Sequence, residues 1–251
     1  MLAVFSQNGK SKMSHSLKYS VEYGLKACLP HYGKSVERII AYLPSIPNIR
    51  KNIQYLTEQE LTAIRHTLEN DGTISLQDKA IITLTMYTGL RGCDISALTL
   101  DNFDWEHDLI QITQAKTGQP LTLPLRAVVG NVVFDYLLHE RPQCIEPYVF
   151  LTVRVPHRRL HTSNLDAICS KVMRKAGIRQ GENERKSIHL FRHYVATALL
   201  QVGIQQPVIS ATLGHVSPAS LDRYLSTEFK RLKECSLSIE AFPIGKEAFD
   251  V

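Results

Sequence analysis

The chain has 251 residues, of which 44% are hydrophobic and 21% charged, enough for one sizeable domain and a smaller one. The brief apolar start runs at once into polar residues, and no stretch approaches the length of a bilayer span, so we expect neither a signal peptide nor a membrane protein. Its five cysteines are scattered without a Cys-x-x-Cys pair, which argues against a disulfide framework and a thiolate zinc site and favours a reducing, cytoplasmic compartment.

Positive charge is concentrated at the beginning of the chain. Residues 1–51 hold eight lysines and arginines against two acids, whereas the net charge of the whole chain is only +5, so the rest is nearly neutral. A basic arm on a near-neutral body indicates a polyanion partner, because such an arm releases counterions from a nucleic-acid backbone. A solvated, partly disordered tail would have the same composition.

The basic segment is expected to form a small helical unit. Apolar residues recur at helical spacing over residues 16–43, with breaks at Pro30 and Gly33. Pro44, Pro47 and the polar stretch to residue 52 predict a linker. We therefore separate a segment of residues 1–51 from a main domain of residues 52–251.

The main domain begins with two predicted helices. Thr57 and Glu60 form a capping-box pattern in front of an apolar face, which predicts a helix that ends by Gly72. A second helix begins at Ser75 and ends at Gly89, so that the residues just after it lie in a turn between helices.

Alternation and then helical periodicity describe the remainder. Residues 109–113 and 121–125 alternate around a turn at 116–118, which predicts a hairpin. Helical spacing follows over residues 128–138, 163–176, 189–202 and 207–213, and again from residue 217. The predicted fold class is mainly α with a small antiparallel β-sheet (α+β).

Two motifs in the first half carry cations that could meet a phosphate. Thr-Gly-Leu-Arg at residues 88–91 places Arg91 after a helix end, with Asp94 three residues later, and Lys116 lies at the hairpin tip. Each also fits an ordinary structural role. The first could be a C-cap followed by a surface ion pair, and the second a solvated turn lysine.

Two further motifs lie in the second half. His189 and Arg192 are three apart on one helix face and could reach the same phosphate. A zinc site at His189 and His193 is disfavoured, because the glutamate of the helical zinc motif is absent and an arginine adjoins it. The fourth motif is Leu-Gly-His ending at His215, with Tyr224 nine residues later; the spacing also fits an ordinary half-buried tyrosine on a short helix.

The order and spacing of the four motifs resemble the tyrosine recombinase (phage integrase) family over roughly residues 52–230. The resemblance implies a site-specific DNA recombinase or integrase that cleaves and rejoins DNA through a 3′-phosphotyrosine, with no ATP, cofactor or metal. The catalytic residues that it implies are Arg91, Lys116, His189, Arg192, His215 and the nucleophile Tyr224.

The family pattern also implies a role for each residue. The two arginines would stabilise the negative charge that grows on the phosphate oxygens. His189 would accept or relay the proton of the tyrosine, His215 would bind the phosphate, and Lys116 would protonate the departing 5′ oxygen. Asp94 is expected to support and orient Arg91.

Double-stranded DNA is the expected partner. Backbone contacts are predicted from a basic loop and a basic helix, through Arg154, Arg158, Arg159, Lys171, Arg174 and Lys175. The resemblance further implies that residues 1–51 are part of a DNA-clamping domain, and that the tail from about residue 226 docks on a neighbouring protomer. We therefore expect a monomer that becomes a homotetramer on paired DNA sites; alternatively, the tail folds back on its own domain.

Two other functions remain compatible with these residues. A type IB topoisomerase uses a similar constellation to nick and reseal one strand, although Leu-Gly-His and His-x-x-Arg are closer to the recombinases. A catalytically inactive DNA-binding regulator derived from an integrase is the second alternative, and the presence of all six polar residues argues against it.

Overall fold

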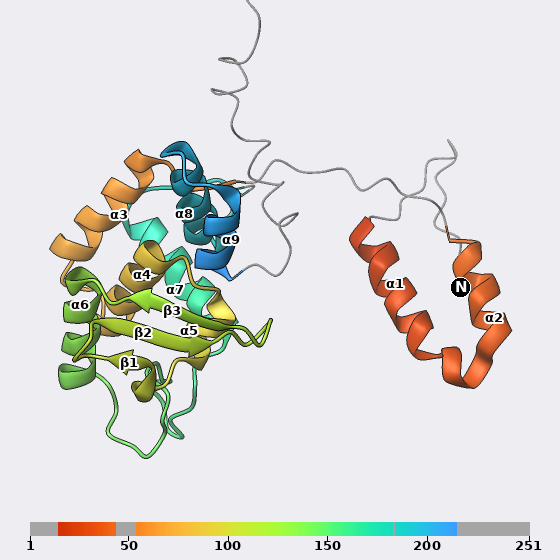
Figure 1. Cartoon of the computed structure of the whole chain (residues 1–251), viewed down its shortest axis with the longest axis horizontal. Coiled ribbons are helices and arrows are strands. Elements are labelled where there is room, and N and C mark those ends of the chain that lie inside the picture. Colours follow the sequence, from red (N-terminus) through yellow and green to blue (C-terminus); the bar gives the residue numbers. More distant parts are fainter. Residues whose placement is uncertain (1–14, 44–53, 183, 215–251) are drawn as a thin grey trace, which may run out of the picture. The chain divides into compact units, whose positions relative to one another are not determined.

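A computed structural model describes residues 15–43, 54–182 and 184–214 (Figure 1). They fall into two compact units, one before and one after the boundary between Lys51 and Asn52. The first unit contains α1 (His15–Ala27) and α2 (Leu29–Ala41), which contact each other. Gly33, with φ 38°, interrupts α2 where the sequence predicted a break, and Pro30 is accommodated in the first turn of α2, where its missing N–H costs nothing.

The second unit is mainly helical and includes a three-stranded sheet, which confirms the predicted fold class. Its helices are α3 (Glu58–Asn70), α4 (Leu76–Thr88), α5 (Gly92–Ala97), α6 (Ala127–His139), α7 (Thr162–Lys175), α8 (His189–Gln201) and α9 (Gln206–Leu213), with a 3₁₀ helix η1 (Leu100–Asn102). Its strands are β1 (Phe103–Asp104), β2 (Leu109–Thr113) and β3 (Pro120–Pro124). Within the described ranges, no helix has the length and apolar character needed to cross a bilayer.

Local capping fixes the first two helices of this unit. The Thr57 hydroxyl accepts a hydrogen bond from the Glu60 N–H at 3.2 Å, and the Glu60 carboxylate accepts one from the Thr57 N–H at 2.8 Å. The Ser75 hydroxyl caps α4, and Gly89 ends that helix in the left-handed conformation at φ 61°. The predicted capping box and both ends of α4 are therefore confirmed.

The sheet is a meander whose alternate side chains face the core. Strands β2 and β3 pair antiparallel with Ile110 opposite Leu123, and both residues are buried. The predicted hairpin is thus confirmed. The sequence did not predict β1, a two-residue strand in which Phe103 pairs with Ile110.

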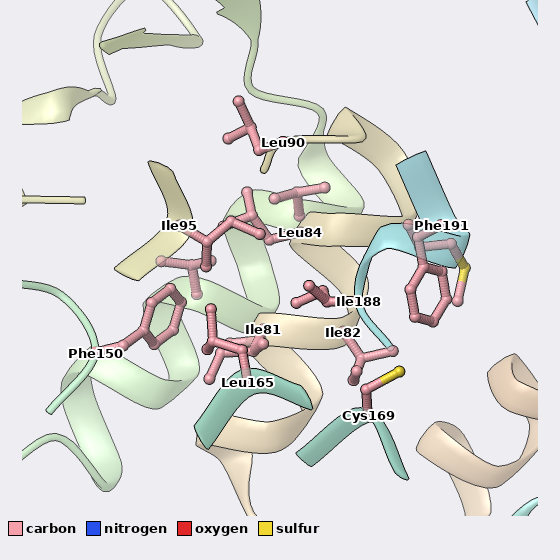
Figure 2. Close-up of a cluster of buried hydrophobic side chains, with 14 of the residues drawn as sticks. Ile81, Ile82, Leu84, Leu90, Ile95, Phe150, Leu165, Cys169, Ile188 and Phe191 are labelled. Atoms are coloured by element: carbon pink, nitrogen blue, oxygen red, sulfur yellow. The ribbon is translucent and has the colours of Figure 1, made fainter. Parts of the chain in front are cut away.

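Helix α4 lies at the centre of the unit and contacts α6, α7 and α8. Figure 2 shows its residues Ile81, Ile82 and Leu84 among the side chains of Ile188 and Phe191. Burying each such aliphatic side chain contributes about 1.5–3 kcal/mol. This packing brings the end of α4, which precedes Arg91, close to the beginning of α8, which carries His189 and Arg192.

Candidate active site

Arg91 lies at the N-cap of α5, directly after the turn that follows α4. Its Nη1 donates to Oε1 of Gln114 at 2.9 Å, and its Nη2 donates to the carbonyl oxygen of Gly214 at 2.9 Å. Oδ2 of Asp94 is 3.8 Å from Nη1, and Oδ1 of Asp94 accepts a hydrogen bond from the Ala115 N–H at 2.8 Å. Asp94 therefore contacts both Arg91 and the hairpin.

Arg192 lies near the beginning of α8, on its buried face, and is only 5% exposed. Its Nη1 donates to the carbonyl of Gly89 at 2.9 Å, and its Nη2 donates to the carbonyl of Leu213 at 2.6 Å. Both carbonyls belong to the ends of helices, which lack intrahelical donors and attract positive charge. Arg192 thus ties the end of α4 to the end of α9.

The two guanidinium groups converge on consecutive residues. Arg192 holds the carbonyl of Leu213, and Arg91 holds that of Gly214. Gly214 has φ 63°, a conformation that costs a residue with a Cβ about 1–2 kcal/mol. A Cβ at Gly214 would also lie 1.9 Å from Nε2 of Gln114, so a glycine is required for the close approach as well as for the turn.

Gln114 is the residue of this site that the sequence analysis missed. It directly follows the last residue of β2, is 1% exposed and contacts Arg91. A signal was present, because Gln114 continues the buried alternation of Ile110 and Ile112 as a polar residue. A buried polar side chain at a core-facing position requires hydrogen-bond partners, so the pattern indicated that Gln114 contacts other polar groups.

Lys116 and His189 lie on the solvent side of the same region. Lys116 is exposed in the turn between β2 and β3, and His189 is the exposed first residue of α8. Desolvation by the neighbouring protein lowers the pKa of His189 below its ordinary 6.5. The charge of Lys116 also lowers this pKa, so the hairpin tip lies within electrostatic reach of the histidine, whereas Asp166 opposes the shift.

The remaining two predicted catalytic residues, His215 and Tyr224, lie outside the described residues, as does the tail from residue 226. The structure therefore brings together Arg91, Arg192 and Asp94, and sets Lys116 and His189 beside them. The last described residue, Gly214, adjoins His215 in the chain.

The predicted DNA-contacting loop lies between α6 and α7 of the second unit. Arg154, Arg158 and Arg159 are all exposed. The loop is held by the Thr152 hydroxyl, which accepts a hydrogen bond from the Arg158 N–H at 3.0 Å, and by the Arg159 guanidinium over the Tyr148 ring at 5.3 Å. Its charges are thus presented on an ordered turn.

The predicted basic helix α7 differs from this loop. Lys171 forms an ion pair with the buried Asp78 at 2.7 Å, and Lys175 forms one with Asp71 at 2.7 Å, whereas Arg174 is exposed. Lys175 also hydrogen-bonds to Thr73. The pairs join α7 to α3 and α4, which favours a structural role for the two lysines; their contact with DNA stays a prediction.

Two arginines, a lysine in the hairpin turn and a histidine at the start of α8 thus lie in one region, and such fixed positive charge is what an anionic group would require. Across the described part of the chain, no group of three or more His, Cys, Asp or Glu side chains could hold a metal ion. The fold and these residues define a class of mainly helical domains with a three-stranded sheet and a cluster of cationic side chains.

The chain belongs to the phage integrase family, whose family profile matches residues 54–231. A relative from Sinorhizobium fredii (strain NGR234), named "Putative integrase/recombinase y4gC", is 30% identical over 185 residues, which are 73% of this chain and 94% of that protein. Two other relatives from the same organism match over 40% and 42% of their own lengths.

Solved structures share the fold. XerH site-specific recombinase bound to its palindromic difH substrate, in a post-cleavage complex, has a TM-score of 0.65 at 18% identity, covering 94% of this chain and 75% of that one. A lambda integrase dimer bound to a COC′ core site has a TM-score of 0.62 at 14% identity, covering 86% of this chain and 73% of that one. The arrangement of helices and sheet is therefore that of these recombinases.

Proposed function

We propose that this tyrosine-type recombinase breaks and rejoins DNA through a covalent bond between Tyr224 and a 3′ phosphate. The observation that carries the proposal is the convergence of Arg91 and Arg192 on the consecutive carbonyls of Leu213 and Gly214, immediately before His215. Any phosphate held beside His215 would lie near two permanently charged guanidinium groups.

The arginines would stabilise the charge of the reaction. When a tyrosine oxygen attacks a phosphodiester, negative charge grows on the non-bridging oxygens, and fixed donors lower the barrier. Arg91 and Arg192 stay charged at any working pH, and each guanidinium group carries five N–H donors in a planar arrangement that suits phosphate oxygens. Removing one such donor typically costs about 100- to 1000-fold in rate.

The proton transfers would use the remaining residues. As the bond from Tyr224 Oη to phosphorus forms, His189 takes or relays the phenolic proton, and the P–O5′ bond breaks with its electron pair on oxygen. Lys116 then supplies a proton to that oxygen. Because the phosphotyrosine conserves the energy of the ester, the reverse attack by a 5′ hydroxyl rejoins the strand without ATP.

DNA would be held by exposed positive charges of both units. Arg154, Arg158, Arg159 and Arg174 are exposed, and we propose that they contact phosphates. The two-helix unit of residues 1–51, with its excess of positive charge, would form part of a clamp on the duplex. With DNA as its partner, the protein would act in the cytoplasm, where the cellular DNA lies.

The assembly would form on DNA. We propose a monomer in solution and a homotetramer on two paired sites, joined through the tail beyond residue 226. The dimer of lambda integrase on a core site is a precedent for assembly on DNA in a protein of this fold. Native mass measurement of the protein with paired sites would test this; a complex with one protomer per site throughout recombination contradicts it.

A trapping experiment tests the chemistry. The protein is incubated with DNA that is nicked beside the cleavage position and is then denatured. Cleavage releases a short fragment that carries the new 5′ hydroxyl, and once this fragment has diffused away the strand cannot be rejoined. We expect a denaturant-resistant adduct with the wild type and with Tyr87→Phe, and none with Tyr224→Phe. Tyr87 is a matched control because phenylalanine keeps the ring under Arg126. An adduct that persists in Tyr224→Phe overturns the assignment of the nucleophile.

The trapping assay and a plasmid relaxation assay together separate the other functions. Binding without any adduct would point to an inactive regulator. Rapid relaxation of a plasmid that carries no recombination site would point to a topoisomerase.

A further inference from the structure

Gln114 makes contacts that join three parts of the site. Its Oε1 accepts hydrogen bonds from Arg91 Nη1 at 2.9 Å and from the Thr117 hydroxyl at 2.7 Å. Its Nε2 donates to the carbonyl of Leu213 at 3.2 Å. One buried amide therefore contacts the first arginine, the lysine hairpin and the end of α9.

The partners determine which way the amide points. Arginine has only donors and a carbonyl has only acceptors, so exchanging oxygen and nitrogen of the Gln114 amide would break both contacts. The backbone of Gln114 is fixed too, since its N–H donates to the Gln119 carbonyl at 2.9 Å and its carbonyl accepts from the Gly118 N–H at 2.8 Å. These bonds close the turn that carries Lys116.

The contact with α9 is equally close. Gly214 leaves no room for a Cβ beside the Gln114 amide, so the end of α9 is seated directly on this side chain. Arg91 completes a ring of contacts, because it binds both Gln114 and the carbonyl of Gly214. A displacement of Gln114 would move the guanidinium of Arg91 and the turn of Lys116 together.

We propose that Gln114 is a positioning residue that holds Arg91, the Lys116 hairpin and the end of α9 in one fixed arrangement for cleavage. The inference rests on the proposed function. It assigns no contact between Gln114 and DNA. Its effect is transmitted through Arg91, which acts on the phosphate oxygens, and through Lys116, which supplies the proton to the leaving oxygen.

A leaving group that needs no proton separates these two effects. In DNA with sulfur in place of the 5′ bridging oxygen, attack by Tyr224 forms the O–P bond and breaks the P–S bond, and the electron pair leaves on sulfur. A thiol has a pKa of about 8.5, so its thiolate departs without an acid. Cleavage of this DNA depends on Arg91 but no longer on Lys116.

The experiment compares single-turnover cleavage of ordinary and phosphorothiolate DNA. Gln114→Met, which keeps the length of the side chain but removes its amide, should cleave ordinary DNA about 100-fold more slowly than the wild type. On phosphorothiolate DNA we expect roughly a 10-fold defect, because only the misplacement of Arg91 then counts. DNA affinity should stay within about twofold, since the residue lies beneath the surface.

Thr117→Val provides a second, milder variant. It removes the hydroxyl that bonds to Gln114 while leaving Arg91 in place. It should slow cleavage of ordinary DNA by about 10-fold and cleave phosphorothiolate DNA at the wild-type rate. Gln119→Met is the matched control, because Gln119 is exposed in the same hairpin, and it should behave as the wild type on both.

The outcomes distinguish the inference from the function on which it rests. If the wild type forms no Tyr224-dependent adduct on either DNA, the proposed function and the inference both fail. If the wild type cleaves and the Gln114→Met and Thr117→Val variants match it, only the inference fails. Equal defects on both DNAs would contradict the coupling to Lys116. Should Gln114→Met lose its cooperative thermal unfolding, the result with Thr117→Val decides.

Discussion

Arg192 donates a hydrogen bond of 2.6 Å from Nη2 to the carbonyl oxygen of Leu213, two residues before His215. A residue that we assign to catalysis thereby also fixes the end of α9. Since its other amino group holds the Gly89 carbonyl, Arg192 supports the fold and the site with the same side chain.

Replacing Arg192 should therefore impair both stability and cleavage. Arg192→Met leaves the Gly89 carbonyl without its side-chain donor and the Leu213 carbonyl with only the 3.2 Å bond from Gln114, and an unpaired buried group costs about 1–3 kcal/mol. We expect a lower midpoint of urea unfolding, and at least a 100-fold loss of cleavage at a temperature where the variant is folded.

Arg141→Lys is the control for this effect. Arg141 also donates to backbone carbonyls, those of Glu146 and Tyr148, but lies outside the site. It should lower the free energy of unfolding and leave the cleavage rate of the folded protein unchanged. Equal losses of cleavage in the two variants would show that Arg192 acts through stability alone.

Gly214→Ala should damage the site more than the left-handed backbone alone explains. The φ of 63° costs alanine about 1–2 kcal/mol, and the added Cβ must displace the Gln114 amide that lies 1.9 Å away. Gly177→Ala has a similar φ of 69° with nothing within 4 Å, and so it isolates the backbone cost. The midpoint of thermal unfolding and the cleavage rate should both fall further in Gly214→Ala than in Gly177→Ala. Equal values in the two variants would contradict the close contact between Gly214 and Gln114.

The pH dependence of cleavage should reflect His189. The proposed role requires neutral imidazole, and desolvation and nearby cations lower its pKa below 6.5. The acid limb of the rate profile should therefore lie below pH 6.5, and Asp166→Asn should move it lower still, because the carboxylate of Asp166 raises this pKa. Asparagine retains an oxygen for the Ile188 N–H, which Asp166 now holds at 2.9 Å. Single-turnover rates between about pH 5 and 8 measure the limb, and an unmoved limb would refute the assignment.

The free energy of unfolding should also depend on pH through the lowered pKa of His189. Below pH 6.5 the unfolded chain binds a proton at His189 more readily than the folded protein does, so the contribution of this group to stability declines as the pH falls. His189→Gln should reduce that slope in urea unfolding measured over the same range. A slope unchanged by the substitution would place its cause elsewhere.

Lys171 and Arg158 should differ in what they contribute to DNA binding. Lys171→Met leaves the buried Asp78 without its ion-pair partner and should destabilise the fold by about 1 kcal/mol, since the lysine end is partly exposed. Arg158→Ala should instead weaken DNA binding and reduce the slope of log affinity against log salt by about one. If Lys171→Met also reduced the slope of log affinity against log salt, this lysine would contact a phosphate after all.

Local sequence signals predicted most of the elements of the second unit. Thr57 with Glu60, Ser75 and Gly89 define helix ends through contacts within a few residues, and the alternation around Lys116 defines the hairpin. Strand β1 was not predicted because two residues are too few to show an alternating pattern. Only the pairing of Phe103 with Ile110 makes them a strand.

By itself, the sequence determined the fold class, the family pattern and the residues that we propose for phosphate binding, because these depend on residue type, order and spacing along the chain. Tertiary structure decided that Arg91 and Arg192 hold consecutive carbonyls, that Gln114 lies between Arg91 and the end of α9, and that Lys171 is paired with Asp78. The physical reason is that hydrogen bonds and ion pairs act over a few ångströms. Residues that are 21 to 123 positions apart in the chain come within that range only when α4, α8, α9 and the hairpin pack together.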